Sequence, residues 1–183
     1  MGAYRDRKNR QEALLVRLLI DGDAASQIET AVIFARKNNI MVHIYCDYNH
    51  EYESEYAQIH IVDQSPGSAD YAIISFCKRG DILITNDIGL ASIALAKGVF
   101  VLNNHGFIYT NRNITTYVNH LYIHDTARRK PNIHDTARRK TKKHNIRPDD
   151  INLKHPNTSF IESLNHVYRR AQEREGKDEK TLT

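Results

Sequence analysis

The chain lacks any run of apolar residues long enough to cross a membrane, which takes about 18 or more in a row. Its N-terminal residues 1–13 are basic, but the apolar stretch at 14–20 is interrupted by Arg17 and ends in Asp21 rather than in a small-residue cleavage site. This pattern does not fit a secretory signal peptide. We therefore expect a cytoplasmic protein that has no membrane partner.

Cysteine is also scarce, because the 183 residues include only Cys46 and Cys77. Both lie inside segments with a strand or helix pattern, so we expect two buried thiols and neither a disulfide nor a cysteine metal site. The length is enough for one domain with a sizeable core, plus extensions. Nothing in the sequence indicates the oligomeric state.

Charge is unevenly distributed along the chain, although the net charge is only +4. Residues 14–121 contain 7 Lys/Arg and 11 Asp/Glu, whereas residues 124–147 contain 9 Lys/Arg and 2 Asp. An acidic body with a basic segment suits a protein that places a polyanion such as RNA over a cation site. The alternative is that the basic segment only aids solubility.

Strand-length apolar runs alternate with helical stripes between residues 14 and 121. The helical stripes begin near Ile28, Ala69, Leu90 and Ile114. This alternation predicts a three-layer α/β domain whose mainly parallel sheet has its first strand in the centre and helices on both faces. The expected strands are 14–20, 40–46, 59–62, 81–85 and 99–102.

Beyond this domain the sequence changes character. The segment IHDTARRK at 123–130 is repeated at 133–140, and Pro131 between the copies excludes a continuous helix. We interpret this as a duplication in an exposed basic arm. Ser159 and Glu162 have the spacing of a capping box, which predicts a final helix. The expected divisions are a basic extension at 1–13, the α/β domain at 14–121, the arm at 122–157, the helix at 158–171 and a disordered tail at 172–183.

Four aspartates are placed where they would meet at one edge of such a sheet. Asp21 and Asp23 follow the first strand, Asp87 follows the fourth, and Asp70 lies in the first turn of a helix. Carboxylates that converge repel one another unless a hard cation joins them, so the pattern predicts a Mg²⁺ or Mn²⁺ site. Each aspartate alone could instead cap a helix. Asp81 precedes a strand, belongs to the opposite edge and is excluded.

Further polar residues accompany these aspartates. Thr85 and Asn86 could orient a phosphate or a metal-bound water, or could simply close the turn. Ser26, near the start of the first helix, could donate to a phosphate or be an ordinary first-turn residue. The tyrosine-rich segment 47–57 reads as a mobile loop. Contacts to a nucleic-acid backbone are expected from the arm, namely from Arg128, Arg129, Arg138, Arg139, Lys142 and Lys143.

Four short motifs lie within residues 16–121: DGDAAS at 21–26, GSAD at 67–70, TNDIGLA at 85–91 and NNHGFIYT at 103–110. Together they resemble the YaiI/YqxD family, uncharacterised bacterial proteins regarded as PIN-like and so akin to metal-dependent ribonucleases. The chain departs from the family by lacking the Cys-Pro pair that ends its first motif, and by having glycine where the family has proline in the third.

The resemblance implies a PIN-like fold and an RNA-cleaving site built on Asp21, Asp23, Asp70 and Asp87. Two other functions stay open at this point. The acidic edge could be vestigial in a non-catalytic protein that binds RNA or ribosomes through its arm. Alternatively, a phosphohydrolase could use Asp21 as nucleophile and Asp23 as acid, with Thr85 holding the phosphate.

Overall fold

The computed structural model describes residues 16–22, 26–48, 52–119 and 159–181. Asp23 and the six basic arm residues predicted to contact nucleic acid therefore lie outside the described residues, as do the extension at 1–13 and the arm at 122–157. The helices are α2 (Ile28–Lys37), α3 (Ser68–Phe76), α4 (Ile88–Ala96) and α6 (Phe160–Thr181), and the chain is also helical at 114–119.

The strands form one six-stranded sheet in the order β3-β2-β1-β4-β5-β6. The first five are parallel, and β6 pairs antiparallel with β5. The predicted α/β fold with β1 in the centre is confirmed, while the two-residue β6 was not predicted. The bounds are β1 Arg17–Asp21, β2 Met41–Asp47, β3 Gln58–Val62, β4 Ile82–Ile84, β5 Phe100–Leu102 and β6 Ile108–Tyr109.

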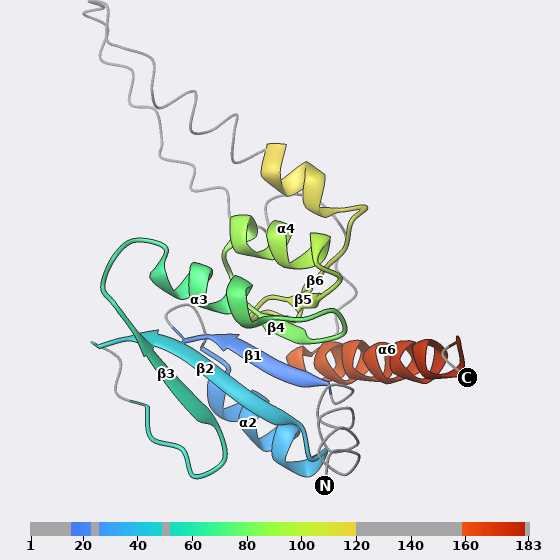
Figure 1. The fold of residues 1–183 in the computed structure, drawn as a ribbon, viewed down its shortest axis with the longest axis horizontal. Coiled ribbons are helices and arrows are strands. Elements are labelled where there is room, and N and C mark those ends of the chain that lie inside the picture. The colour runs from blue at the N-terminus through green and yellow to red at the C-terminus, as the bar shows by residue number, and fades with distance from the viewer. Residues whose placement is uncertain (1–15, 23–25, 49–51, 120–158, 182–183) are drawn as a thin grey trace, which may run out of the picture.

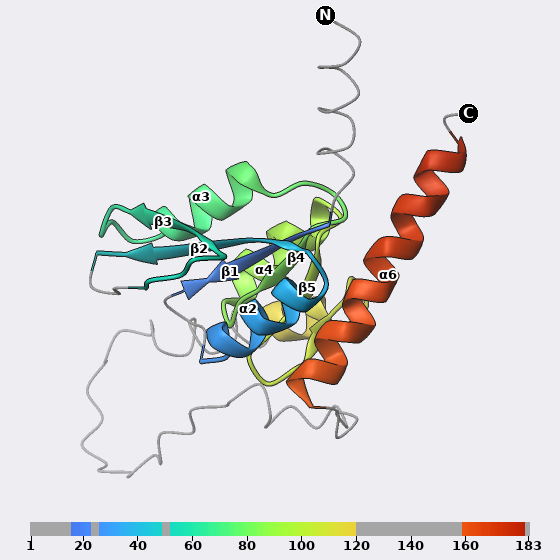
Figure 2. The same ribbon diagram turned by 90° about the horizontal axis from the view of Figure 1, so that it is seen from below.

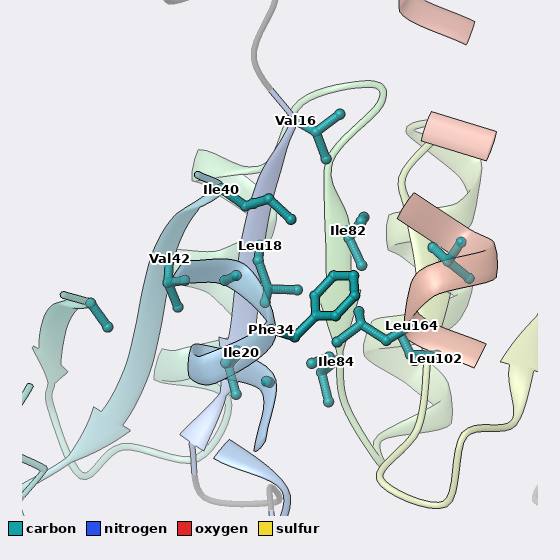
Figure 3. Packing of buried hydrophobic residues seen from close by; sticks show 14 of the residues in the cluster. Val16, Leu18, Ile20, Phe34, Ile40, Val42, Ile82, Ile84, Leu102 and Leu164 are labelled. Carbon is teal, nitrogen blue, oxygen red and sulfur yellow. The ribbon is translucent and has the colours of Figure 1, made fainter. Parts of the chain in front are cut away.

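Helices cover both faces of the sheet, which makes three layers (Figures 1 and 2). Leu18 and Ile20 of β1 point to the face covered by α2 and α6, whereas Leu19 between them points to the face covered by α3 and α4. In Figure 3, Phe34 of α2 fills the space beside β1 and β4, with Leu164 of α6 next to it. Burial on both faces explains why the central strands are apolar at successive positions.

The last helix begins with the predicted capping box. The Ser159 N–H donates to Glu162 Oε2 at 2.9 Å, and the Glu162 N–H donates to Ser159 Oγ at 3.3 Å. However, α6 continues to Thr181, so the predicted helix end at 171 and the disordered tail from 172 are wrong for residues up to 181. The residues there are mostly Glu, Lys, Arg and Gln, which have high helix propensity.

At the amino edge of the sheet, a buried ion pair joins β1 to the start of β4. Arg17 Nη2 lies 2.5 Å from Asp81 Oδ2, and the guanidinium lies 4.4 Å from the centre of the Phe76 ring. Asp81 therefore belongs to this edge, as predicted. Both cysteines are buried, also as predicted. None of the described helices is long and apolar enough to span a membrane.

Two histidines, buried His43 and half-buried His60, form a pair between β2 and β3. His43 Nδ1 lies 3.0 Å from His60 Nε2, and the Tyr45 ring stacks on His60 with 4.5 Å between centres. Burial, with smaller contributions from His60 and Arg17 against an opposing one from Asp81, lowers the pKa of His43 to about 4. Burial also lowers the pKa of His60. Both side chains are therefore neutral near pH 7 in the folded protein.

We predict that this pair makes the fold sensitive to acid. Between about pH 6.5 and pH 4 the unfolded chain binds more protons than the folded one, so the free energy of unfolding falls as the pH falls. His43→Phe should keep the aromatic contact with Phe76 and reduce the loss between ~pH 7 and ~pH 4.5 by on the order of 2 kcal/mol in urea titrations. His166→Gln, on the exposed face of α6, is the control and should behave like wild type. Equal acid sensitivity of His43→Phe and wild type would contradict the prediction.

Candidate functional site

An aspartate stands at or just after the end of each of four neighbouring parallel strands. Asp21 and Asp47 are the last residues of β1 and β2, Asp63 directly follows β3, and Asp87 follows β4. With Asp70 of α3 they line one cavity of about 390 Å³. The carboxyl edge of the sheet is therefore an acidic hollow, at the place where ligands bind in open α/β sheets.

The rest of the cavity wall carries no opposing charge among the described residues. Its other described lining residues are neutral and belong to the end of β3 and the turn that leads into α3. The wall therefore attracts cations and repels anions, unless a bound cation reverses its sign. Those neutral residues are Val62, Gln64, Ser65, Pro66, Gly67, Ser68 and Ala69.

Asp21 is held by Thr85. The carboxylate is only 5% exposed, and the Thr85 hydroxyl donates to its Oδ2 at 2.7 Å. The same hydroxyl oxygen accepts from the Asp87 N–H at 3.0 Å, so one side chain joins the ends of β1 and β4. Since the only hydroxyl proton of Thr85 goes to Asp21, this residue positions the carboxylate and has no proton left to donate to a phosphate.

Asp87 both lines the cavity and caps α4. Its Oδ1 accepts from the Leu90 N–H at 2.7 Å, so the helix-cap alternative is correct for this residue, although it does not exclude a second role. A Cβ at Gly89 would lie 3.0 Å from that oxygen, a close contact that a small shift of the carboxylate would relieve. The neighbouring Asn86 side chain accepts from the Asn104 N–H at 3.2 Å and so braces the loop after β5.

The turn after Asp21 is fixed by close contacts. A Cβ at Gly22 would lie 2.8 Å from the Tyr45 carbonyl oxygen, so only glycine fits without a shift of the backbone. The Tyr52 hydroxyl donates to the Gly22 carbonyl at 3.0 Å, and the Tyr56 hydroxyl donates to the Ile40 carbonyl at 2.9 Å. These two tyrosines anchor residues 52–56 of the predicted loop to the core.

The structure brings together three of the four predicted aspartates, Asp21, Asp70 and Asp87, around one cavity. Ser26 is not with them, because it is exposed and lines a separate cavity of about 340 Å³ beside α2. Among the described residues, no three His, Cys, Asp or Glu side chains are close enough to hold a metal ion by themselves.

Sequence analysis missed Asp47 and Asp63 as members of this site. Both occupy the position that singled out Asp21, directly at the end of an apolar strand run. Asp47 was overlooked because it opens a long polar segment, and Asp63 because the run before it is short. The signal that could have identified them is an acidic residue at the end of each predicted parallel strand, whatever sequence follows the strand.

We predict that Thr85 is required to hold Asp21 in place. Thr85→Val keeps the shape but removes the Thr85 hydrogen bond from a buried carboxylate, which should lower the free energy of unfolding by about 1.5–3 kcal/mol. Thr85→Ser keeps the hydroxyl and is the matched control. Urea denaturation of both variants checks this. A loss in the serine variant as large as in the valine variant would show that the methyl group, and not the hydrogen bond, matters.

Comparison with known proteins gives one consistent result. A family model described as "Uncharacterized BCR, YaiI/YqxD family" matches residues 19–150. A UPF0178 protein of Clostridium tetani is 41% identical over 99 residues, which cover 54% of this chain and 68% of that protein. One of Oceanobacillus iheyensis is 36% identical over 118 residues, covering 62% of this chain and 80% of that protein. No solved structure matches.

Proposed function

The chain belongs to the YaiI/YqxD family, and we propose that it is a divalent-cation-dependent nuclease that hydrolyses RNA. The observation that carries the proposal is the set of strand-end aspartates, Asp21, Asp47, Asp63 and Asp87, around one cavity with no basic residue in its described wall. Carboxylates that line one cavity repel one another. A bound cation would relieve this repulsion, and the free energy gained would contribute to the affinity for the cation.

The residues fit Mg²⁺ or Mn²⁺ better than a softer metal. Every acidic group in the cavity wall offers hard carboxylate oxygens, and neither His nor Cys is among its described residues. The cavity of about 390 Å³ is far larger than one ion, which suits a cation that keeps most of its water ligands. Asp21 and Asp87 would be the first ligands, with Asp70 and the adjacent Asp23 completing the set.

The residues of the site and the cation would have different roles in the proposed RNA hydrolysis. Thr85 fixes the Asp21 carboxylate before any substrate arrives, so no rearrangement is needed when charge develops. The cation, when bound, would activate water and stabilise the charge on the scissile phosphate. Without it the acidic wall repels the phosphate, so cleavage should depend strictly on the cation.

RNA is the proposed substrate because the family resembles PIN-like ribonucleases and because a basic segment accompanies the acidic domain. Residues 124–147 contain 9 Lys/Arg and 2 Asp, enough to bind a nucleic-acid backbone without reading its sequence. The proposed contacts are those named from the sequence, Arg128, Arg129, Arg138, Arg139, Lys142 and Lys143. A cytoplasmic location is part of the same proposal.

One observation favours a second candidate, a non-catalytic RNA-binding protein. Among the described residues no three acids are close enough to hold a metal without further ligands. The acidic edge would then be vestigial, and binding would depend on the arm alone. The phosphohydrolase alternative has less support, because Thr85 uses its only proton on Asp21.

Paired neutralisation of Asp21 and Asp87 tests the nuclease against the binding protein. Asp21→Asn with Asp87→Asn keeps both shapes and an acceptor that can cap α4. In wild type, Mg²⁺ or Mn²⁺ should raise the melting temperature, bind in calorimetry and support cleavage of single-stranded RNA. In the double variant we expect at least about 100-fold less cleavage and no cation-dependent stabilisation. No cation binding and no cleavage by wild type, with RNA binding intact, would favour the second candidate.

We predict that Asp47 and Asp63 each contribute part of the affinity for the cation. Neutralising either one, as Asp47→Asn or Asp63→Asn, should weaken cation binding by a few-fold to about tenfold, since each removes one charge from the cavity wall. Glu55→Gln removes one charge from an exposed residue that does not line the cavity, and should leave the affinity unchanged. Calorimetric titration of the three variants separates a local effect from a general change in net charge.

A further inference from the structure

The outer edge of β3 is unprotected. β3 is the last strand in the sheet order, and no described strand pairs with its outer side. Natural proteins usually guard such an edge with lysine, proline, a bulge or a covering segment. Residues Gln58–Val62 contain neither lysine nor proline, and they pair with β2 in an unbroken register that leaves no bulge.

Large apolar side chains are exposed beside this edge. Ile61 of β3 is 57% exposed and Tyr71 of α3 is 77% exposed. Both line a groove of about 460 Å³ between β3 and α3, together with Val62 and Pro66. Open backbone groups next to large exposed apolar side chains are typical of a surface that is covered by a partner.

We propose that β3 pairs with β3 of a second copy of this chain, antiparallel about a two-fold axis at His60. The strand is self-complementary in this register. Ile59 of each copy faces Ile61 of the other, which makes two apolar cross-strand pairs. Further from the axis, Gln58 faces Val62 and Ala57 faces Asp63. No two like charges are therefore opposed from 57 to 63. The interface is isologous, as in most homodimers.

The same axis brings further contacts on both faces of the sheet. It runs perpendicular to the sheet, so the α3 helices of both copies lie on one side and their Tyr71 rings flank the junction. The isoleucine pairs lie on the opposite side, because side chains alternate along a strand. His60 does not obstruct the axis, since its ring is held within its own copy by Tyr45 and His43.

This pairing separates the proposed nuclease sites of the two copies. Antiparallel strands point their carboxyl ends in opposite directions, so the two acidic cavities open at opposite edges of the joined sheet. Formation of the dimer does not require a bound cation, so the two proposals can fail separately. A strand from an unrelated protein is the competing occupant, and it would leave the chain monomeric when pure.

Sedimentation velocity on the full chain over a concentration series tests the dimer. Wild type should associate reversibly to a dimer. In Ile61→Lys each copy contributes one lysine to the interface, which should weaken the dimer at least about tenfold. Ile93→Lys is the matched control, because Ile93 is 53% exposed on α4, far from this edge, and should leave dimerisation unchanged. A monomeric wild type, or an Ile61→Lys variant that dimerises normally, would overturn the proposal.

Cysteine cross-linking tests the register. Residue 60 lies opposite itself across the axis, where Cα atoms of antiparallel strands are about 4.5–5.5 Å apart, within the range for a disulfide. His60→Cys should therefore give a disulfide-linked dimer under mild oxidation. Ile61→Cys is offset from its own symmetry mate by two residues and should not. Cross-linking of Ile61→Cys, or of neither variant, would exclude pairing about His60.

Discussion

Two-sided burial of the central strands is the constraint on which the rest of this structure depends. Because helices cover both faces, the side chains of Leu18–Ile20 and Ile82–Ile84 are all withdrawn from solvent. No polar group can be placed within those strands without a large desolvation cost. The chain therefore places its charges immediately beyond the apolar runs, with the Arg17–Asp81 ion pair at one edge and the aspartates at the other.

The two edges handle their charge differently. At the amino edge, Asp81 is neutralised by Arg17 and also accepts the Lys78 N–H at 2.7 Å. At the carboxyl edge, Asp21 and Asp87 receive hydrogen bonds rather than a described opposite charge. Helices α3 and α4 also begin at this edge, and the partial positive charge of their N-termini offsets some of the repulsion between carboxylates. These hydrogen bonds and helix N-termini reduce the repulsion between the carboxylates at this edge.

Much of the fold follows from local patterns, and the failures have physical causes. Alternating apolar runs and helical stripes predicted the sheet and its helices, because burial on two faces leaves a strong signal. The two-residue β6 leaves no periodicity to detect, and the charged end of α6 resembles a disordered tail in composition. Strand ends predicted Asp21 and Asp87, and a helix start predicted Asp70, but the role of Thr85 depends on a contact across the sheet that no local pattern encodes.

The Thr85–Asp21 hydrogen bond joins residues 64 positions apart in the chain. During synthesis, a nascent chain that has emerged just past β3 already carries Asp21, Asp47 and Asp63, yet it lacks the Thr85 hydroxyl that orients the first of them. The acidic edge is completed only when β4 inserts beside β1, a non-local step that fixes the centre of the sheet. Maturation of the site is thus tied to completion of the fold, so partly made or locally opened chains would lack an organised centre.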